Sequence, residues 1–128
     1  METKVIFNSD LHFEHIQWKR ELLFWKDEIR SFQNRLEEIV EKWTDSKILA
    51  ELGQFQNNFS IHNNKIGKYL EEIDTHEHNI AVHFQANENV IDRVHLKYHE
   101  SFRDKLNVQR NMYNDLKHKY YIFLSKYM

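Results

Sequence analysis

The chain has 128 residues, with 18 basic and 20 acidic side chains and a formal net charge of −2. Cysteine is absent, which excludes disulfides, thiolate nucleophiles and cysteine-based zinc sites. Without a basic excess there is no reason to expect nucleic acid or an anionic membrane as a partner. The absence of proline and the presence of only two glycines favour long helices, because strand-rich folds need both residues at their turns.

These counts predict one soluble domain covering residues 1–128. The N-terminal segment contains only a short apolar run, Val5-Ile6-Phe7, which is too short for a signal peptide. No stretch approaches the roughly 18 apolar residues of a membrane span. We therefore expect a cytoplasmic protein.

The first predicted helix covers approximately residues 10–43. Its apolar residues and one histidine recur at alternating steps of four and three, the pattern of a helix that packs along its whole length. They are Leu11, His15, Trp18, Leu22, Trp25, Ile29, Phe32, Leu36, Ile39 and Trp43. The segment from Thr44 to Ser46 then supplies a break and N-cap candidates for the next helix.

The second predicted helix covers approximately residues 46–85 and continues the same steps. Its inward residues are Ile48, Leu52, Phe55, Phe59, His62, Ile66, Tyr69, Ile73, His76, Ile80 and His83. Gly53 and Gly67 lie inside this run, and each costs about 1 kcal/mol of helix stability relative to Ala. A break at either glycine would give four helices in all. The uninterrupted register favours a single helix.

The third predicted helix covers approximately residues 90–127, after a break at residues 87–89, with Asn89 as the N-cap and Asp92 as its partner. Its inward residues are Ile91, His95, Tyr98, Phe102, Leu106, Gln109, Tyr113, Leu116, Tyr120, Phe123 and Tyr127. Short connections make neighbouring helices antiparallel. The sequence thus predicts an all-α fold, with three long antiparallel helices in a coiled-coil-like bundle.

Seven of the nine histidines fall at one end of this bundle. The two turns place residue 15 level with about residue 74, and residue 76 level with about residue 99, at a rise of about 1.5 Å per residue. The end with the second turn then holds His12, His15, His76, His78, His83, His95 and His99. His62 and His118 lie at other depths, where we interpret them as structural or surface residues.

Several of these histidines are candidate metal ligands. His15, His76, His83 and His95 occupy inward positions, and His99 shares a helical face with His95 at a spacing that lets two imidazoles reach one metal. A single inward histidine is more often a hydrogen-bonded core residue. Four at one level are harder to explain in that way, because every buried ring nitrogen needs a partner.

We therefore predict a transition-metal site with His15, His76, His95 and His99 as ligands and His12 in reserve. Imidazole without sulfur suits zinc, iron, copper or nickel, and zinc is our first choice. Acidic residues near this level could complete the coordination shell or orient a ring by accepting its N–H. They are Glu14, Asp74, Glu77, Asp92 and Glu100.

The alternative prediction is a non-enzymatic structural or adaptor module that forms a homodimer or binds a protein partner. Apolar residues outside the regular steps would widen the core or face that partner: Ile16, Leu23, Phe24, Val40, Leu70 and Phe84. Such a module could respond to pH, because clustered histidines repel one another once protonated. An enzyme is less favoured than either, because no nucleophile with an adjacent base is recognisable.

The chain also resembles a group of short all-helical proteins of Bacteroidetes-type bacteria. The segments that carry the resemblance lie in the first two predicted helices, and they are Leu11-His12-Phe13-Glu14-His15 with Trp18, Lys26-Asp27-Glu28-Ile29, Arg35-Leu36-Glu37-Glu38, Thr44-Asp45, Phe55-Gln56-Asn57 and His76-Glu77-His78. The third helix matches only loosely. The resemblance implies a helical fold and transfers no activity or site.

Overall fold

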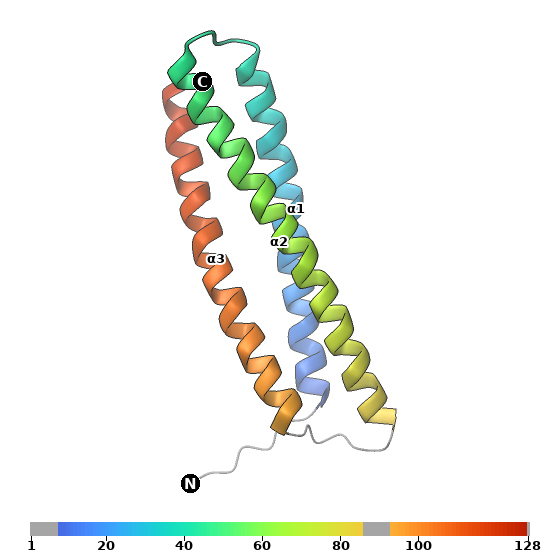
Figure 1. The fold of residues 1–128 in the computed structure, drawn as a ribbon. Helices are drawn as coiled ribbons and strands as arrows, with labels where there is room; N and C mark the ends of the chain where they lie inside the picture. Colours follow the sequence, from blue (N-terminus) through green and yellow to red (C-terminus); the bar gives the residue numbers. More distant parts are fainter. Residues whose placement is uncertain (1–7, 86–92, 128) are drawn as a thin grey trace.

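The computed structural model describes residues 8–85 and 93–127, apart from the side chains of residues 8, 83–85 and 93. These residues form α1 (Asn8–Val40), α2 (Ser46–Gln85) and α3 (Arg93–Tyr127). The helices lie side by side as long rods, and α2 runs opposite to its neighbours (Figure 1). The all-α fold of three antiparallel helices is confirmed. The predicted cap at Asn89 and Asp92 lies outside the described residues.

Most of the predicted inward positions that the structure describes form the core; the exceptions are Trp43, His95 and Tyr127, which are half-buried, and Tyr98, which is exposed. Ile91 and the side chain of His83 lie outside the described residues. One continuous apolar cluster runs from Trp18 and Phe102 to Ile39, Ile48 and Phe123. Its members on each helix are spaced by alternating fours and threes, so each helix presents one apolar stripe to the other two. Burial of these stripes, more than helix propensity, stabilises helices of this length.

The first turn begins earlier than expected. We predicted a helix to residue 43, but α1 ends at Val40, and the N–H of Lys42 donates to the carbonyl of Ile39 at 3.0 Å. This tight final turn stops the helix. The Asp45 carboxylate then accepts the N–H groups of Lys47 and Ile48, at 2.8 and 3.3 Å, and caps α2.

Helix α2 is continuous over 40 residues and passes through both glycines, as the register indicated. A Cβ atom added at Gly53 or Gly67 would meet nothing within 4 Å apart from local backbone. Neither glycine is therefore required for packing. The apolar stripe of α2 holds the helix together despite their unfavourable propensity.

A row of ion pairs fixes the register between α1 and α3. Glutamates on α1 and basic residues on α3 each recur every seven residues, as in the charged flanking positions of packed helices. The pairs are Glu14 with Arg103, Glu21 with Arg110 and Glu28 with Lys117, at 2.6, 2.6 and 2.9 Å. This constant offset shows that α1 and α3 run parallel.

Within the described residues, none of the helices combines the length and apolar character needed to cross a membrane.

Candidate metal centre

The histidine-rich end of the bundle lies beyond the main apolar core. A small separate cluster of Leu11 and Ile80, with Leu96 packed against it, covers this end. Trp18 belongs to the main core and stacks on the ring of His99, with ring centroids 4.6 Å apart. The imidazoles therefore lie between two apolar layers.

Three buried histidines meet here, one from each helix: His15 of α1, His76 of α2 and His99 of α3. The ring centroids of His15 lie 5.0 Å from those of both His76 and His99. One nitrogen from each residue can be chosen so that all three lie within 4.8 Å of one another. A single metal ion could therefore be held by all three. The levels along the bundle axis that we calculated from the two turns correctly predicted that these three residues would meet.

The inward register at the start of α3 differs from the prediction. We placed Tyr98 inside, but Tyr98 is 47% exposed whereas His99 is fully buried. Counting back from Phe102 by three and then four reaches His99 and His95, which keeps the alternation of the rest of α3. His95 is only half-buried, and its ring centroid lies 6.3 Å from that of His76. The structure thus places His95 beside the trio.

Glu77 anchors the trio on the α1–α2 side. Its Oε2 accepts the Nδ1–H of His15 at 2.5 Å, and its Oε1 accepts the Nδ1–H of His12. With both oxygens engaged, the carboxylate is fixed against α1. His12 itself is exposed and reaches the site through Glu77.

Glu14 anchors the trio on the α1–α3 side. Its Oε1 accepts the Nε2–H of His99 and also the Nη2–H of Arg103 at 2.6 Å, while its Oε2 accepts the Nε–H of Arg103 at 3.2 Å. This two-pronged contact restricts the carboxylate to one orientation. Glu14 thus belongs both to the row of ion pairs and to the histidine site.

The three histidines are neutral at pH 7, because burial lowers the pKa of each one. For His76 burial and the neighbouring histidines lower the pKa to about 4. For His15 and His99 burial lowers the pKa more than the bonds to Glu77 and Glu14 raise it. The contacts with the two carboxylates are therefore hydrogen bonds from neutral rings. Neutral imidazole is the form that binds metals.

Both carboxylates remain ionised. Burial raises the pKa of Glu14, but hydrogen bonds from Arg103 and His99 outweigh it, so the pKa lies below its usual value. Burial likewise raises the pKa of Glu77, and the bonds from His15 and His12 again lower it further than burial raises it. The two carboxylates thus lie next to the neutral trio; Arg103 compensates the charge of Glu14, so the charge of Glu77 is the one that chiefly favours a cation there.

The other residues proposed near this level are placed elsewhere. Asp74 pairs with Lys19 at 2.5 Å, and Glu100 and His78 are exposed. Asp92 and the side chain of His83 lie outside the described residues. Of the two histidines predicted at other depths, His62 is buried against Gln109, whose amide donates to its Nδ1, and His118 is exposed.

Sequence reasoning missed Arg103, which holds Glu14 in place. The heptad spacing of acids in the first helix and of bases in the third was the available pattern, and it identifies Arg103 as the partner of Glu14. It also missed that Trp18 is both a core residue and a wall of the site.

No protein-family model, no curated protein and no solved structure matches this chain. The resemblance to helical proteins of Bacteroidetes-type bacteria therefore stays a prediction, and the function has to be argued from the site.

Proposed function

We propose that this protein binds one divalent transition-metal ion through His15, His76 and His99. The observation that carries the proposal is a set of three buried imidazoles, one from each helix, with nitrogens within 4.8 Å of one another. The N···N distance between His15 Nε2 and His76 Nδ1 is 3.2 Å. Two nitrogens bound to one tetrahedral zinc, at about 2.0 Å each, lie about 3.3 Å apart.

Unsatisfied ring nitrogens support a ligand at this position. Among the residues that the structure describes, His76 Nε2 and His99 Nδ1 are buried without a hydrogen-bond partner. A buried polar atom in that state costs about 1–3 kcal/mol, and native proteins contain few of them. A metal ion bound by the trio would remove at least the penalty at His99. A purely structural role for the cluster leaves both penalties in place.

The donor set narrows the class of ion. Three neutral nitrogens without sulfur suit zinc, copper, nickel or iron, and they disfavour magnesium and calcium, which prefer oxygen ligands. Zinc is our first choice, because it accepts a tetrahedral site with three histidines. We propose His95, one helical turn before His99, as the source of the fourth ligand. His12 is a weaker candidate, because its Nδ1 is bonded to Glu77.

Metal binding by untagged protein tests the proposal. Titration with Zn²⁺, followed by calorimetry and elemental analysis, is expected to give one ion per chain. The His76→Ala variant is expected to lose at least 100-fold in affinity, since removal of one of three ligands leaves an incomplete site. His95→Ala should lose less. His62→Ala is the matched control, because His62 is also buried on α2 but lies in a different layer.

Three outcomes contradict the proposal. One is a zinc content far below one ion per chain with no rise in melting temperature on adding Zn²⁺. The second is zinc binding that His76→Ala leaves unchanged. The third, loss of binding in His62→Ala as well, would locate the ion elsewhere.

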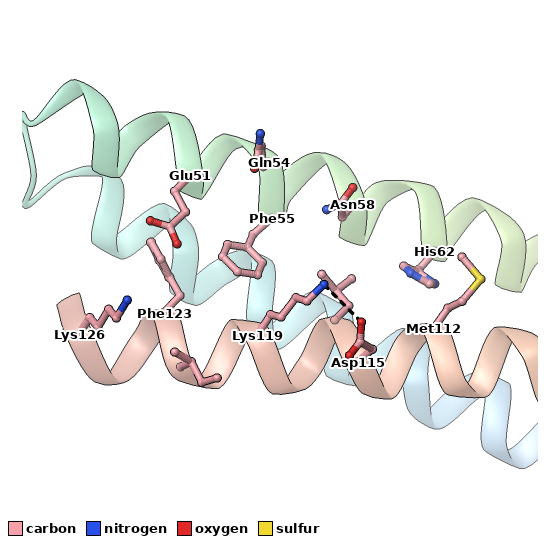
Figure 2. A pocket seen from close by; sticks show the side chains of 12 residues that line it. Glu51, Gln54, Phe55, Asn58, His62, Met112, Asp115, Lys119, Phe123 and Lys126 are labelled. Atoms are coloured by element: carbon pink, nitrogen blue, oxygen red, sulfur yellow. Dashed lines mark ion pairs between the residues drawn. The ribbon is translucent and has the colours of Figure 1, made fainter.

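As a second candidate, we propose self-association through a groove between α2 and α3. The groove has a volume of about 520 Å³ and lies nearer the first turn than the histidine site does. Phe55 and Phe123 line it (Figure 2), together with Leu116. Met112 and Ile122, which also line it, are about half exposed. The groove thus combines apolar side chains with polar ones such as Gln54 and Asn58, and a groove of this kind suits an amphipathic helix as its partner.

A second copy of the chain suits this groove because one acidic residue on the α2 rim can meet a lysine on the α3 rim, where Lys119 already pairs with Asp115. Glu51 lies on the α2 rim and Lys126 on the α3 rim (Figure 2). Two copies with parallel helices would place Glu51 of each opposite Lys126 of the other. Complementary charge of this kind fixes the register of a partner.

Sedimentation velocity tests self-association. The wild type is expected to dimerise and Ile122→Glu to be monomeric, because the new charge would be buried in the interface. Val108→Glu, an exposed α3 position outside the groove lining, is expected to remain dimeric. A wild-type monomer at all concentrations, or a dimer that survives Ile122→Glu, contradicts this candidate.

A further inference from the structure

The two carboxylates contact chemically different nitrogens of their histidines. Glu77 accepts the N–H at Nδ1 of His15, whereas Glu14 accepts the N–H at Nε2 of His99. An ionised carboxylate can only accept, so each contact fixes the ring proton on the nitrogen that faces it. A neutral imidazole carries one proton, and its other nitrogen is then a lone-pair donor.

We infer that Glu77 and Glu14 impose opposite tautomers on the two histidines, so that His15 binds the metal through Nε2 and His99 through Nδ1. The inference rests on the proposed metal site and specifies which atoms form it. Glu77 and Glu14 are positioning residues, because they act on the ion through the rings. A carboxylate behind a histidine ligand also increases the basicity of the nitrogen that binds the metal.

The remaining contacts fit this assignment. Nε2 of His15, left without a proton, is the atom that lies 3.2 Å from Nδ1 of His76. Nδ1 of His99, also left without a proton, is one of the buried nitrogens that lack a hydrogen bond. Because Nε2 of His15 carries no proton, its contact with His76 in the metal-free protein is a hydrogen bond donated by the Nδ1–H of His76. His76 therefore supplies Nδ1 as the third ligand only after this proton moves to its Nε2.

Each carboxylate is itself held in place, which gives the tautomers a structural cause. His12 occupies the second oxygen of Glu77, and Arg103 binds both oxygens of Glu14. The arrangement draws on all three helices, since Glu14 of α1 orients a ring on α3 and Glu77 of α2 orients a ring on α1. The ligand atoms of His15 and His99 are thus set by the packing of the bundle before any ion binds.

Long-range ¹H–¹⁵N correlation NMR of the metal-free protein at pH 7.5 reads each tautomer directly. We expect the proton of His15 on Nδ1 and that of His99 on Nε2. In Glu77→Leu the proton of His15 is expected to lose its preference for Nδ1, whereas Glu77→Gln should retain it, because the amide oxygen still accepts. Glu14→Leu and Glu14→Gln are expected to affect His99 in the same way.

Zinc affinity gives the second measurement. Each leucine variant is expected to bind Zn²⁺ about 10–100-fold more weakly than the wild type, and each glutamine variant should recover part of the loss. The matched controls are Glu21→Leu, one heptad along α1 and bonded to Arg110, and Glu72→Leu on α2, bonded to Lys105. Both remove a half-buried glutamate from an interhelix pair without touching a histidine, so their zinc affinity should be unchanged.

The outcomes separate this inference from the proposed function. If the wild type binds zinc but His15 carries its proton on Nε2, the inference is wrong and the metal site stands. The inference is equally wrong if the tautomers are as expected but the leucine variants bind zinc as tightly as their controls. If the wild type does not bind zinc at all, the proposed function fails, and with it the assignment of metal-binding atoms.

Discussion

The two ends of the bundle use the same helix positions for opposite chemistry. Near the first turn, Phe32, Phe59 and Tyr120 pack together, one from each helix, with ring centroids 4.6–5.4 Å apart. Near the second turn, His15, His76 and His99 meet in the same manner at 5.0–5.6 Å. Each set is buried and lies on the inward stripe of its helix.

The difference lies in how the polar atoms are satisfied. In the aromatic layer the Tyr120 hydroxyl donates to the Phe32 carbonyl at 3.5 Å, so its one polar group has a partner. In the histidine layer two ring nitrogens have no partner within the described part of the chain. The aromatic layer is thus optimised for stability, whereas the histidine layer is not. Such local departures are typical of functional sites.

Removal of an aromatic side chain from the core is expected to have the largest effect on stability. Phe59→Ala should lower the free energy of unfolding by about 3–5 kcal/mol, because it leaves a cavity in a fully buried layer. Urea denaturation measures the loss. Any variant that remains folded should still gain stability from Zn²⁺, since Phe59 is remote from the trio. Loss of the zinc response would show that the two ends are coupled.

Acid is expected to destabilise the histidine end of the metal-free protein. The pKa of His76 is about 4 in the folded state, against 6.5 as its usual value. The unfolded chain therefore binds more protons between these values, and stability is complete above pH 6.5 and falls as the pH approaches 4. For His76 alone the loss is about 3 kcal/mol. The charged or titratable groups that act on this ring are His15, Glu77, His95 and His99.

Denaturation curves in EDTA at several pH values measure this slope. His76→Leu should flatten the dependence between pH 6.5 and 4, whereas His118→Gln, at an exposed position, should not. An unchanged slope in His76→Leu would contradict the assignment.

Replacement of His76 by an apolar residue should make the histidine layer resemble the aromatic layer more closely, since it replaces a metal ligand with a hydrocarbon side chain. In EDTA at pH 7.5, His76→Leu is expected to change the free energy of unfolding by no more than about 1 kcal/mol, because removal of the unsatisfied Nε2 of His76 offsets loss of the hydrogen bond between its Nδ1 and Nε2 of His15. In excess Zn²⁺ the wild type should be clearly the more stable, since it gains about 2.7 kcal/mol at a free concentration 100 times the Kd. Thermal melts with and without Zn²⁺ measure both. A destabilised variant in EDTA would indicate a structural histidine.

Of the interactions tested, the ion pairs between α1 and α3 are expected to contribute least to the free energy of unfolding. Glu21→Gln should lower stability by about 1 kcal/mol or less, because the pair with Arg110 is partly exposed and screened by water. A double-mutant cycle with Arg110→Met isolates this energy. The same cycle for Glu14 and Arg103 should give a larger coupling in the presence of Zn²⁺, because Glu14 also orients His99. Equal coupling in both cycles would argue against that second role.

The sequence by itself determined the three helices and the level of each residue along the bundle axis. The absence of proline and the alternation of four and three steps specify three rods with one apolar stripe each, and short turns make them antiparallel. The level of each residue along the bundle axis follows from the number of residues that separate it from the nearest turn. The meeting of His15, His76 and His99 could therefore be predicted. These properties depend only on the spacing of residues in the sequence, because the regular geometry of a helix fixes where each residue lies along and around its axis.

Only the tertiary structure decided which side chains point inward at the start of α3 and which carboxylates orient the rings. Tyr98 and His99 differ by about 100° around the helix axis, and the packing against Trp18 and His76 selects His99. Five acidic residues were possible partners, and of the four that the structure describes, Glu14 and Glu77 are bonded to the trio. Hydrogen bonds depend on distances of a few tenths of an ångström between helices, and residue spacing does not define these distances.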